Sequence, residues 1–215
     1  MITVEKLLDA ASLTRAHHEL MEPNFPPSEL ISADELVDLV SSGRGMGLAL
    51  VDDKVFRGVA AMQFYEGDMC VLTYLAVASV GRSKGYGMKL LSSVLGEAAL
   101  LGHSFILAEV EPPDTSPASP EHGDPDRRVR FYARFGARAL AVEHWQPPVS
   151  PQYGPVPLTL IALPTSEAGL PTITSTQIER LEREYHGGEL PAGTRASLAV
   201  GPVVETLDLV GMYQG

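Results

Sequence analysis

Residues 74–91 constrain the fold more than any other part of the chain. They form an apolar strand, then Arg82-x-x-Gly85-x-Gly87, and then the start of an amphipathic helix. Glycines let backbone N–H groups approach an anion closely, and the N-terminus of a helix adds the positive end of its dipole. The segment therefore predicts an α/β fold in which a strand–turn–helix unit binds a pyrophosphate.

The spacing of the glycines excludes two common phosphate-binding motifs. A P-loop requires Gly-x-x-x-x-Gly-Lys-Ser/Thr, which the sequence lacks. A dinucleotide-binding turn requires a third glycine at position 90, where the chain has Leu90. Two interpretations remain: an anion-binding turn of another kind, or a plain strand–turn–helix whose glycines only make the turn.

The same segment resembles the coenzyme A signature of the GNAT acyltransferase superfamily. That signature is Gln/Arg-x-x-Gly-x-Gly/Ala after a strand ending in Leu-x-Val, and it matches Leu75, Val77, Arg82, Gly85 and Gly87. The resemblance implies an acetyl-CoA-dependent acyltransferase whose mixed, twisted sheet is flanked by helices. It also implies a cofactor site in which the strand end holds the acyl-pantetheine arm and the turn holds the pyrophosphate: Leu75, Ala76, Val77, Arg82, Ser83, Lys84, Gly85, Tyr86 and Gly87.

A second segment, 130–137, resembles the other GNAT signature, Phe/Leu-Tyr-x-x-x-Gly-Phe. In many members its tyrosine, here Tyr132, protonates the departing thiolate of CoA. An ordinary phenol is protonated at neutral pH and can donate. The alternative is an aromatic core residue at helical spacing. Arg128 is a further candidate for binding CoA, by contacting a phosphate, unless it pairs with Glu109 or Glu111.

Glu109 is the candidate general base. It lies in Leu-Ala-Glu-Val-Glu on the strand after the CoA helix and resembles the basic glutamate of ribosomal-protein N-acetyltransferases. A carboxylate among apolar neighbours is expected to have a raised pKa, which suits a base. The alternative is a salt-bridged or solvent-facing glutamate. Glu111 shares its face of the strand, and many GNAT enzymes use water instead of a direct base.

Composition limits the partners and the compartment. The 215 residues carry a net charge of −11, which argues against nucleic-acid or anionic-membrane binding and would attract a cationic amine. Mean hydropathy is +0.05, with no apolar run long enough to span a bilayer and no signal-peptide pattern at the start. The single cysteine, Cys70, fits a reducing compartment, so we expect a cytoplasmic protein.

The order of predicted elements over residues 1–163 is strand, two helices, three strands, helix, strand, helix and two strands, which is the GNAT order. Residues 164–215 form a C-terminal extension outside that core. There, Thr176-x-x-Glu179 predicts a capped helix and 196–210 predict one or two strands. The extension could cover the acceptor site, pair with a second subunit or pack on the sheet; fold analogy suggests a homodimer.

The expected activity is transfer of an acetyl group from acetyl-CoA to the amine of a small molecule or peptide, by direct attack. Two alternatives stay open: a non-catalytic acyl-CoA-binding regulatory module, and an acyltransferase with a hydroxyl acceptor. No metal is expected. The spacing of His17-His18-Glu19 does not suit two zinc ligands on one helix face, so these residues are predicted to lie on the surface.

Overall fold

Nine strands form one mixed sheet in the computed structural model, which describes residues 1–81, 84–114 and 124–213. The strands follow the order β1-β2-β3-β4-β5-β8-β6-β9, and β7 pairs with β8. Strands β4 and β5 are parallel, as the helix between them predicts, and the other described pairs are antiparallel. Their bounds are β1 (Ile2–Leu7), β2 (Gly45–Asp52), β3 (Val55–Tyr65), β4 (Met69–Val77), β5 (Phe105–Val110), β6 (Arg138–Leu140), β7 (His144–Gln146), β8 (Val156–Pro164) and β9 (Thr206–Asp208).

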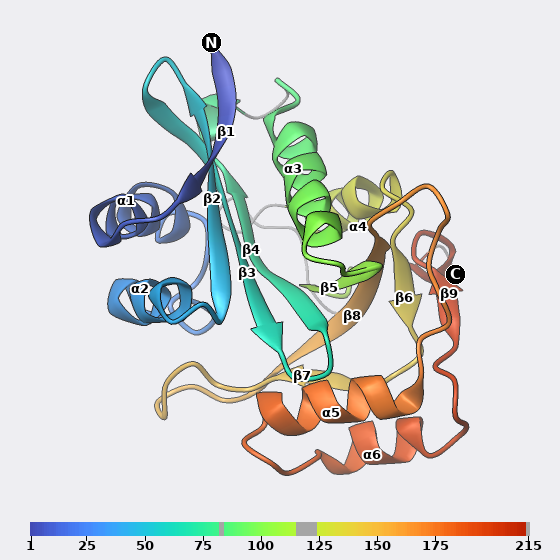
Figure 1. The fold of residues 1–215 in the computed structure, drawn as a ribbon. Helices are drawn as coiled ribbons and strands as arrows, with labels where there is room; N and C mark the ends of the chain where they lie inside the picture. The colour runs from blue at the N-terminus through green and yellow to red at the C-terminus, as the bar shows by residue number, and fades with distance from the viewer. Residues whose placement is uncertain (82–83, 115–123, 214–215) are drawn as a thin grey trace.

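Helices cover both faces of this sheet (Figure 1). Helices α1 and α2 and the π-helical turn η1 lie on one face, and α3 and α4 lie on the other. Successive strand residues point to opposite faces, so Leu48 and Leu50 pack toward α3 whereas Ala49 and Val51 pack toward α1 and α2. The helix bounds are α1 (Ala10–Ala16), η1 (His17–Met21), α2 (Ala33–Ser41), α3 (Tyr86–Leu100), α4 (Pro125–Ala133), α5 (Ser175–Tyr185) and α6 (Ala192–Leu198).

Local sequence signals correctly predict the first half of the fold. Ser32 caps α2 by accepting a hydrogen bond from the Glu35 backbone, and the Glu35 side chain accepts one from the Ser32 backbone. Gly43 follows that helix with a φ of 74°. The β2–β3 hairpin forms as predicted, but its turn lies at Asp53 and Lys54, one residue later than the predicted Asp52 and Asp53; both turn residues have positive φ.

Three predicted elements differ in the structure. The helix expected over 7–20 begins at Ala10 and continues as the π-helical turn η1. The single strand expected over 137–145 is two short strands, β6 and β7, separated by a turn. Helix α4 ends at Ala133, short of Gly136, and its N-cap, Asp124, makes no side-chain capping bond.

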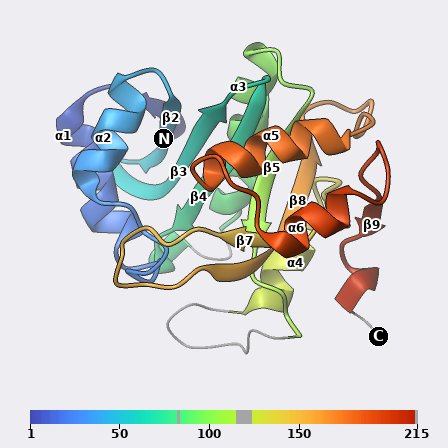
Figure 2. The ribbon, with the colours of Figure 1, turned by 90° about the horizontal axis from the view of Figure 1, so that it is seen from below.

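The extension packs on the sheet (Figure 2). Helix α5 buries Ile178 and Leu181 against Leu107 of β5, and β9 pairs with β6 at the sheet edge. The capping box predicted at Thr176 and Glu179 is wrong: Thr174 and Gln177 form it, two residues earlier. The strand prediction for 196–210 is also wrong at its start, because residues 196–198 belong to α6; only Thr206–Asp208 are a strand.

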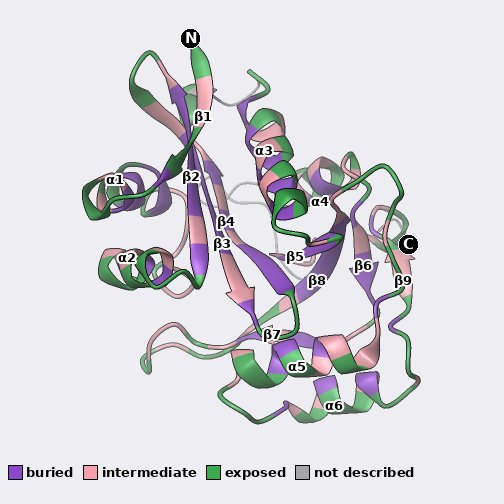
Figure 3. Cartoon of the chain, viewed as in Figure 1, coloured by how far each residue is buried: buried purple, intermediate pink, exposed green. Residues whose placement is uncertain are grey.

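Buried residues follow the central strands and the helix faces turned toward them (Figure 3). They form three clusters, which lie under α3 and α4, under α1 and α2, and under α5. The third cluster joins the extension to Tyr65, Met69 and Val71 of the predicted core domain. None of the described helices has both the length and the apolar character needed to cross a membrane.

Candidate functional site

The predicted pyrophosphate turn joins β4 to α3. Gly85 is the N-cap of α3 with a φ of 76°, a conformation that side-chain-bearing residues avoid, so glycine is required by the backbone. A Cβ at Gly87 would lie 3.4 Å from the Phe131 ring, which places this turn against α4. The Tyr86 side chain points away, donating from its hydroxyl to Asp52 over 2.9 Å. Lys84 is exposed, whereas Arg82 and Ser83 lie outside the described residues.

A gap opens between β4 and β5 where the resemblance places the pantetheine arm. The two strands pair only at Val71–Leu107 and Leu72–Ala108 in the described register. Next to this pairing, Thr73 bulges from the β3–β4 ladder, four residues before the expected position near Val77. A cavity of about 100 Å³ occupies the gap, and its walls include Leu75, Tyr132, Glu109, Glu111 and Arg128.

Tyr132 lies at this cavity and is 8% exposed. Burial raises the pKa of Tyr132 to about 12, although the nearby Arg128 opposes the shift. The phenol is therefore protonated at neutral pH and can donate a proton. The residue also belongs to the core under α3 and α4, so the core interpretation of Tyr132 and the catalytic one are compatible.

Arg128 forms an ion pair with Glu111, one of the two carboxylates expected from the sequence. Both side chains are partly exposed and line the same cavity as Tyr132. Burial lowers the pKa of the Arg128 guanidinium, but an arginine remains charged at neutral pH. Glu109, the other carboxylate of β5 at this cavity, bonds His144 and Tyr185 instead.

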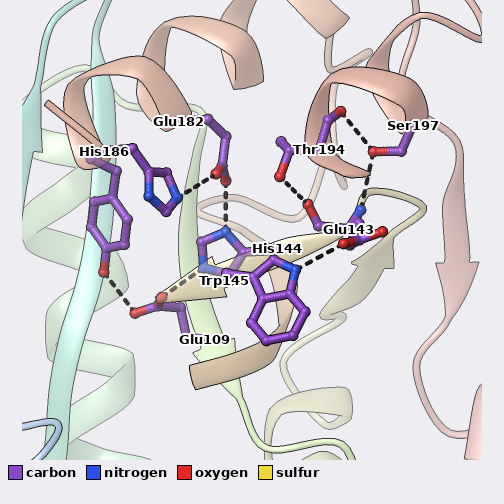
Figure 4. A network of polar contacts seen from close by, with 9 residues as sticks. Glu109, Glu143, His144, Trp145, Glu182, His186, Thr194 and Ser197 are labelled. Atoms are coloured by element: carbon purple, nitrogen blue, oxygen red, sulfur yellow. Dashed lines mark hydrogen bonds and ion pairs between the residues drawn. The ribbon is translucent and has the colours of Figure 1, made fainter. Parts of the chain in front are cut away.

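Glu109 is held by a buried polar network (Figure 4). His144 Nε2 lies 2.7 Å from Glu109 Oε1, and the Tyr185 hydroxyl donates to Glu109 Oε2 over 2.9 Å. On its other side, His144 Nδ1 lies 2.6 Å from Glu182 Oε1. The side chains of His144 and Glu182 are 1% and 0% exposed, so this is an ion-paired interior cluster.

The sequence did not reveal these partners. His144 is isolated in the sequence, and Glu182 and Tyr185 lie in the extension, 38 and 41 residues further along. The sequence does predict that Ile178, Leu181 and Tyr185 share one face of a helix. It does not predict which strand that face packs against.

The charge of His144 makes stability depend on pH. Burial by itself lowers the pKa of His144, but its bonds to Glu109 and Glu182 outweigh burial and raise the pKa from 6.5 to about 10. Because the folded pKa is the higher one, this contribution to the unfolding free energy is complete below about pH 6.5. It is lost as pH rises through about 10.

We therefore expect the stability advantage of wild type over His144→Gln to shrink between neutral pH and pH about 10. Urea unfolding at a series of pH values measures it. An advantage that stays constant over this range would contradict the charged state of His144.

A second, larger cavity of about 530 Å³ adjoins the first, and Phe25 lines both. Its walls come from the segment after α1 and from the β7–β8 connection, including Glu22, Glu35 and Tyr153. The sequence also offers Tyr65 and Trp145, with Phe25, as candidates for lining an acceptor pocket. In the structure Tyr65 packs under α5, and Trp145 donates to Glu143 over 2.9 Å.

Comparison with solved structures identifies the fold. An acetyltransferase of the GNAT family from Bacteroides thetaiotaomicron matches 88% of this chain and 99% of its own, with a TM-score of 0.65 and 19% identity. The ribosomal-protein-S18-alanine N-acetyltransferase of Escherichia coli matches 79% and 97%, with a TM-score of 0.55 and 19% identity. A Salmonella typhimurium structure described with its cofactor acetyl-CoA matches 80% and 98%, with a TM-score of 0.53 and 18% identity.

No family model matches the sequence, and no curated protein matches it. The structural comparison nevertheless confirms the expected fold class: this chain has the GNAT acetyltransferase fold. The sheet, the helix after the glycine turn and the opening between β4 and β5 are the parts of that fold on which the candidate site is built.

Proposed function

We propose that the protein is an N-acetyltransferase that moves an acetyl group from acetyl-CoA to a primary amine of a small molecule or peptide. The observation that carries the proposal is one cavity, in the gap between β4 and β5, that brings together Leu75, Tyr132 and Glu109. Acyl transfer needs a proton acceptor for the attacking ammonium and a proton donor for the leaving thiolate. This cavity contains a candidate for each.

In the proposed reaction, the ammonium gives a proton to Glu109, directly or through water. The freed amine attacks the thioester carbonyl, forming the C–N bond. As the C–S bond breaks, Tyr132 protonates the thiolate, and the second proton lost by the nitrogen restores the phenol through water. A backbone N–H near Val77 stabilises the oxyanion, while backbone N–H groups of the turn containing Gly85 and Gly87 hold the pyrophosphate.

The charge of the two cavities supports a cationic acceptor. Carboxylates line both: Glu29, Glu109 and Glu111 in the smaller cavity, and Glu22 and Glu35 in the larger. The overall charge of −11 has the same sign. An amine that is protonated in water is attracted to such a site before it loses its proton there.

The first test is binding of acetyl-CoA to wild type and to Gly85→Glu, by calorimetry. The variant places an anion beside the pyrophosphate and forces a left-handed conformation that costs about 1–2 kcal/mol on an ordinary residue. Within residues 1–81, 84–114 and 124–213, no heavy atom outside the neighbouring residues lies within 4 Å of the added Cβ, so these residues leave room for it. We expect wild type to bind and Gly85→Glu to lose binding.

Gly102→Glu is the matched control, because Gly102 also has positive φ and open space but lies after the far end of α3. Thiol release against a panel of amines and alcohols follows. Release with an amine supports the proposal, and release only with a hydroxyl acceptor would replace it. Binding without release in any assay would favour the regulatory module, and absence of binding would refute acetyl-CoA as the substrate.

A further inference from the structure

Both oxygens of Glu109 are fixed by donors from outside its own strand. His144 of β7 bonds Oε1, and Tyr185 of α5 bonds Oε2. Burial and the charge of Glu109 raise the pKa of Tyr185 well above that of a free tyrosine, so its hydroxyl remains a donor. A carboxylate has about four lone-pair sites, so two bonds leave Glu109 able to accept a proton from a substrate.

The extension also sets the charge of His144. Glu182 is fully buried and faces the imidazole Nδ1, so one histidine lies between two carboxylates. Two buried anions without a cation between them are costly, and protonated His144 offsets this cost. His186 Nε2 lies 3.4 Å from the other oxygen of Glu182. Tyr65, Tyr74 and Glu184 are the further titratable groups near Tyr185.

The second helix of the extension secures the residue before His144. Thr194 of α6 donates to the Glu143 carbonyl over 2.7 Å, and Ser197 accepts from the Glu143 N–H over 3.1 Å (Figure 4). Thr194 is fully buried. At the start of β7, helix α5 therefore holds the side chain of His144, and helix α6 holds the backbone of the residue before it.

We propose that the extension completes the active site: Glu182, acting through His144, and Tyr185 are positioning residues that hold Glu109 for proton removal. This inference rests on the proposed acetyltransferase function. It assigns residues 164–215 a role in the reaction besides their packing on the sheet. The residues involved act on Glu109 and not on acetyl-CoA, so they affect the rate and its pH dependence.

Three variants of α5 test the proposal, with kcat, KM and pH profiles measured on the same amine. Tyr185→Phe removes the donor that orients Oε2 of Glu109, so kcat should fall while the KM for acetyl-CoA is kept. Glu182→Gln removes one anion from beside His144, so the alkaline limb should move to lower pH. Both should lower kcat by about 10- to 100-fold, the scale of a misplaced catalytic group, and keep the affinity for acetyl-CoA.

Glu179→Gln is the matched control, since Glu179 is on the exposed side of the same helix, paired with Arg183. If Glu182→Gln and Tyr185→Phe match this control in kcat and pH profile, the positioning role is wrong while the acetyltransferase remains. A wild type that binds acetyl-CoA but turns over no amine would instead refute the proposed function. Retained binding of acetyl-CoA by each variant shows that a lower kcat does not come from unfolding.

A separate observation concerns His17, which the sequence placed on the surface. The structure buries it to 4% exposure, in the turn η1. Its Nε2 lies 2.8 Å from the Ile31 carbonyl and must carry the proton of that bond, so Nδ1 has a free lone pair when the ring is neutral. This Nδ1 is buried, and no atom in the described part of the chain forms a hydrogen bond with it.

His18 and Glu19 are exposed as predicted, and the π-helical geometry explains how Glu22, five residues after His17, comes to lie beside it. A π-helix bonds residue i+5 to residue i, as Glu22 N does to the His17 carbonyl over 3.0 Å. Glu22 is thereby brought over His17, with its Oε1 3.4 Å from Nδ1, and lies 2.7 Å from His18 Nδ1. The three candidate ligand atoms lie within 4.8 Å of one another.

From this second cluster we infer a divalent metal site, of the zinc type, formed by His17, His18 and Glu22. Histidine and carboxylate are common zinc ligands, and a histidine ligand usually donates its other N–H to a carbonyl or carboxylate, as His17 does to Ile31. His17 and Glu22 also line the larger cavity, which leaves an open side for water or a ligand.

Zinc titration of tag-free protein tests this inference without any assay of activity. Wild type and His103→Ala, which alters a half-buried histidine after α3 that bonds the Asp68 carbonyl, should bind one equivalent. His18→Ala and Glu22→Gln change exposed side chains and should weaken binding by about tenfold or more. No binding by wild type, or equal binding by all four proteins, would overturn the site.

Discussion

Replacement of Tyr132 by phenylalanine is expected to lower kcat by about 10²- to 10⁴-fold, the usual contribution of a general acid. The substitution keeps the ring, which packs edge-on against Phe131 with centroids 5.2 Å apart, so the fold and the affinity for acetyl-CoA should survive. Because the pKa of Tyr132 is about 12, the wild-type residue stays protonated over the usual assay range. The loss should therefore be the same at each pH tested.

Steady-state kinetics of the thiol released, with calorimetry of acetyl-CoA binding, measure this effect. Tyr213→Phe is a suitable control, because it removes a hydroxyl that bonds Thr159 and is not among the residues lining the cavity. A Tyr132→Phe enzyme with the kcat of the control would show that the thiolate is protonated by another group. A loss confined to acetyl-CoA affinity would assign Tyr132 to binding instead.

Glu109→Gln is the second substitution expected to have a large effect, lowering kcat/KM by about 10²- to 10⁴-fold. Glutamine has nearly the same shape and can still accept from Tyr185, but it cannot take a proton from the ammonium. The acid limb of the kcat/KM profile should disappear with the carboxylate. The variant also leaves His144 with Glu182 as its carboxylate partner, so its unfolding midpoint must be measured alongside.

Glu111→Gln distinguishes the two carboxylates of β5. Glu111 lines the same cavity but is paired with Arg128, so its loss should have the smaller effect on kcat and should leave the acid limb in place. The reverse order of effects would make Glu111 the base. Near wild-type kcat in both variants would indicate that water alone accepts the proton, as in GNAT enzymes without a direct base.

The sequence by itself determined the features whose hydrogen bonds are local. The α2 capping box joins residues three apart, and the β2–β3 turn needs only neighbouring residues. At position 85 glycine is favoured because the residue's own φ is positive. The parallel pairing of β4 with β5 also followed from the sequence, because a helix must connect parallel neighbours. These signals, with the three resemblances, were enough to predict the fold and to select Tyr132 and Glu109 as candidates.

Tertiary structure alone decided which groups surround Glu109. His144 and Tyr185 are 35 and 76 residues away along the chain and meet it only because β8 lies between β5 and β7 while α5 covers the same face. The capping box of α5 illustrates the same limit. Both Thr174 and Thr176 start an acceptable pattern, and the observed frame is the one in which Thr174 also bridges Val203.

The turn η1 gives the clearest case of a geometry that residue spacing does not encode. In an α-helix, residues five apart such as His17 and Glu22 would point in different directions. The π-helical turn places their side chains next to each other. Such a turn is stable only where the surrounding packing supports it, here with Leu20 and Met21 buried under the sheet. The sequence thus specified the local elements and the acyl-transfer motifs, and packing between distant segments specified how the charged side chains were paired.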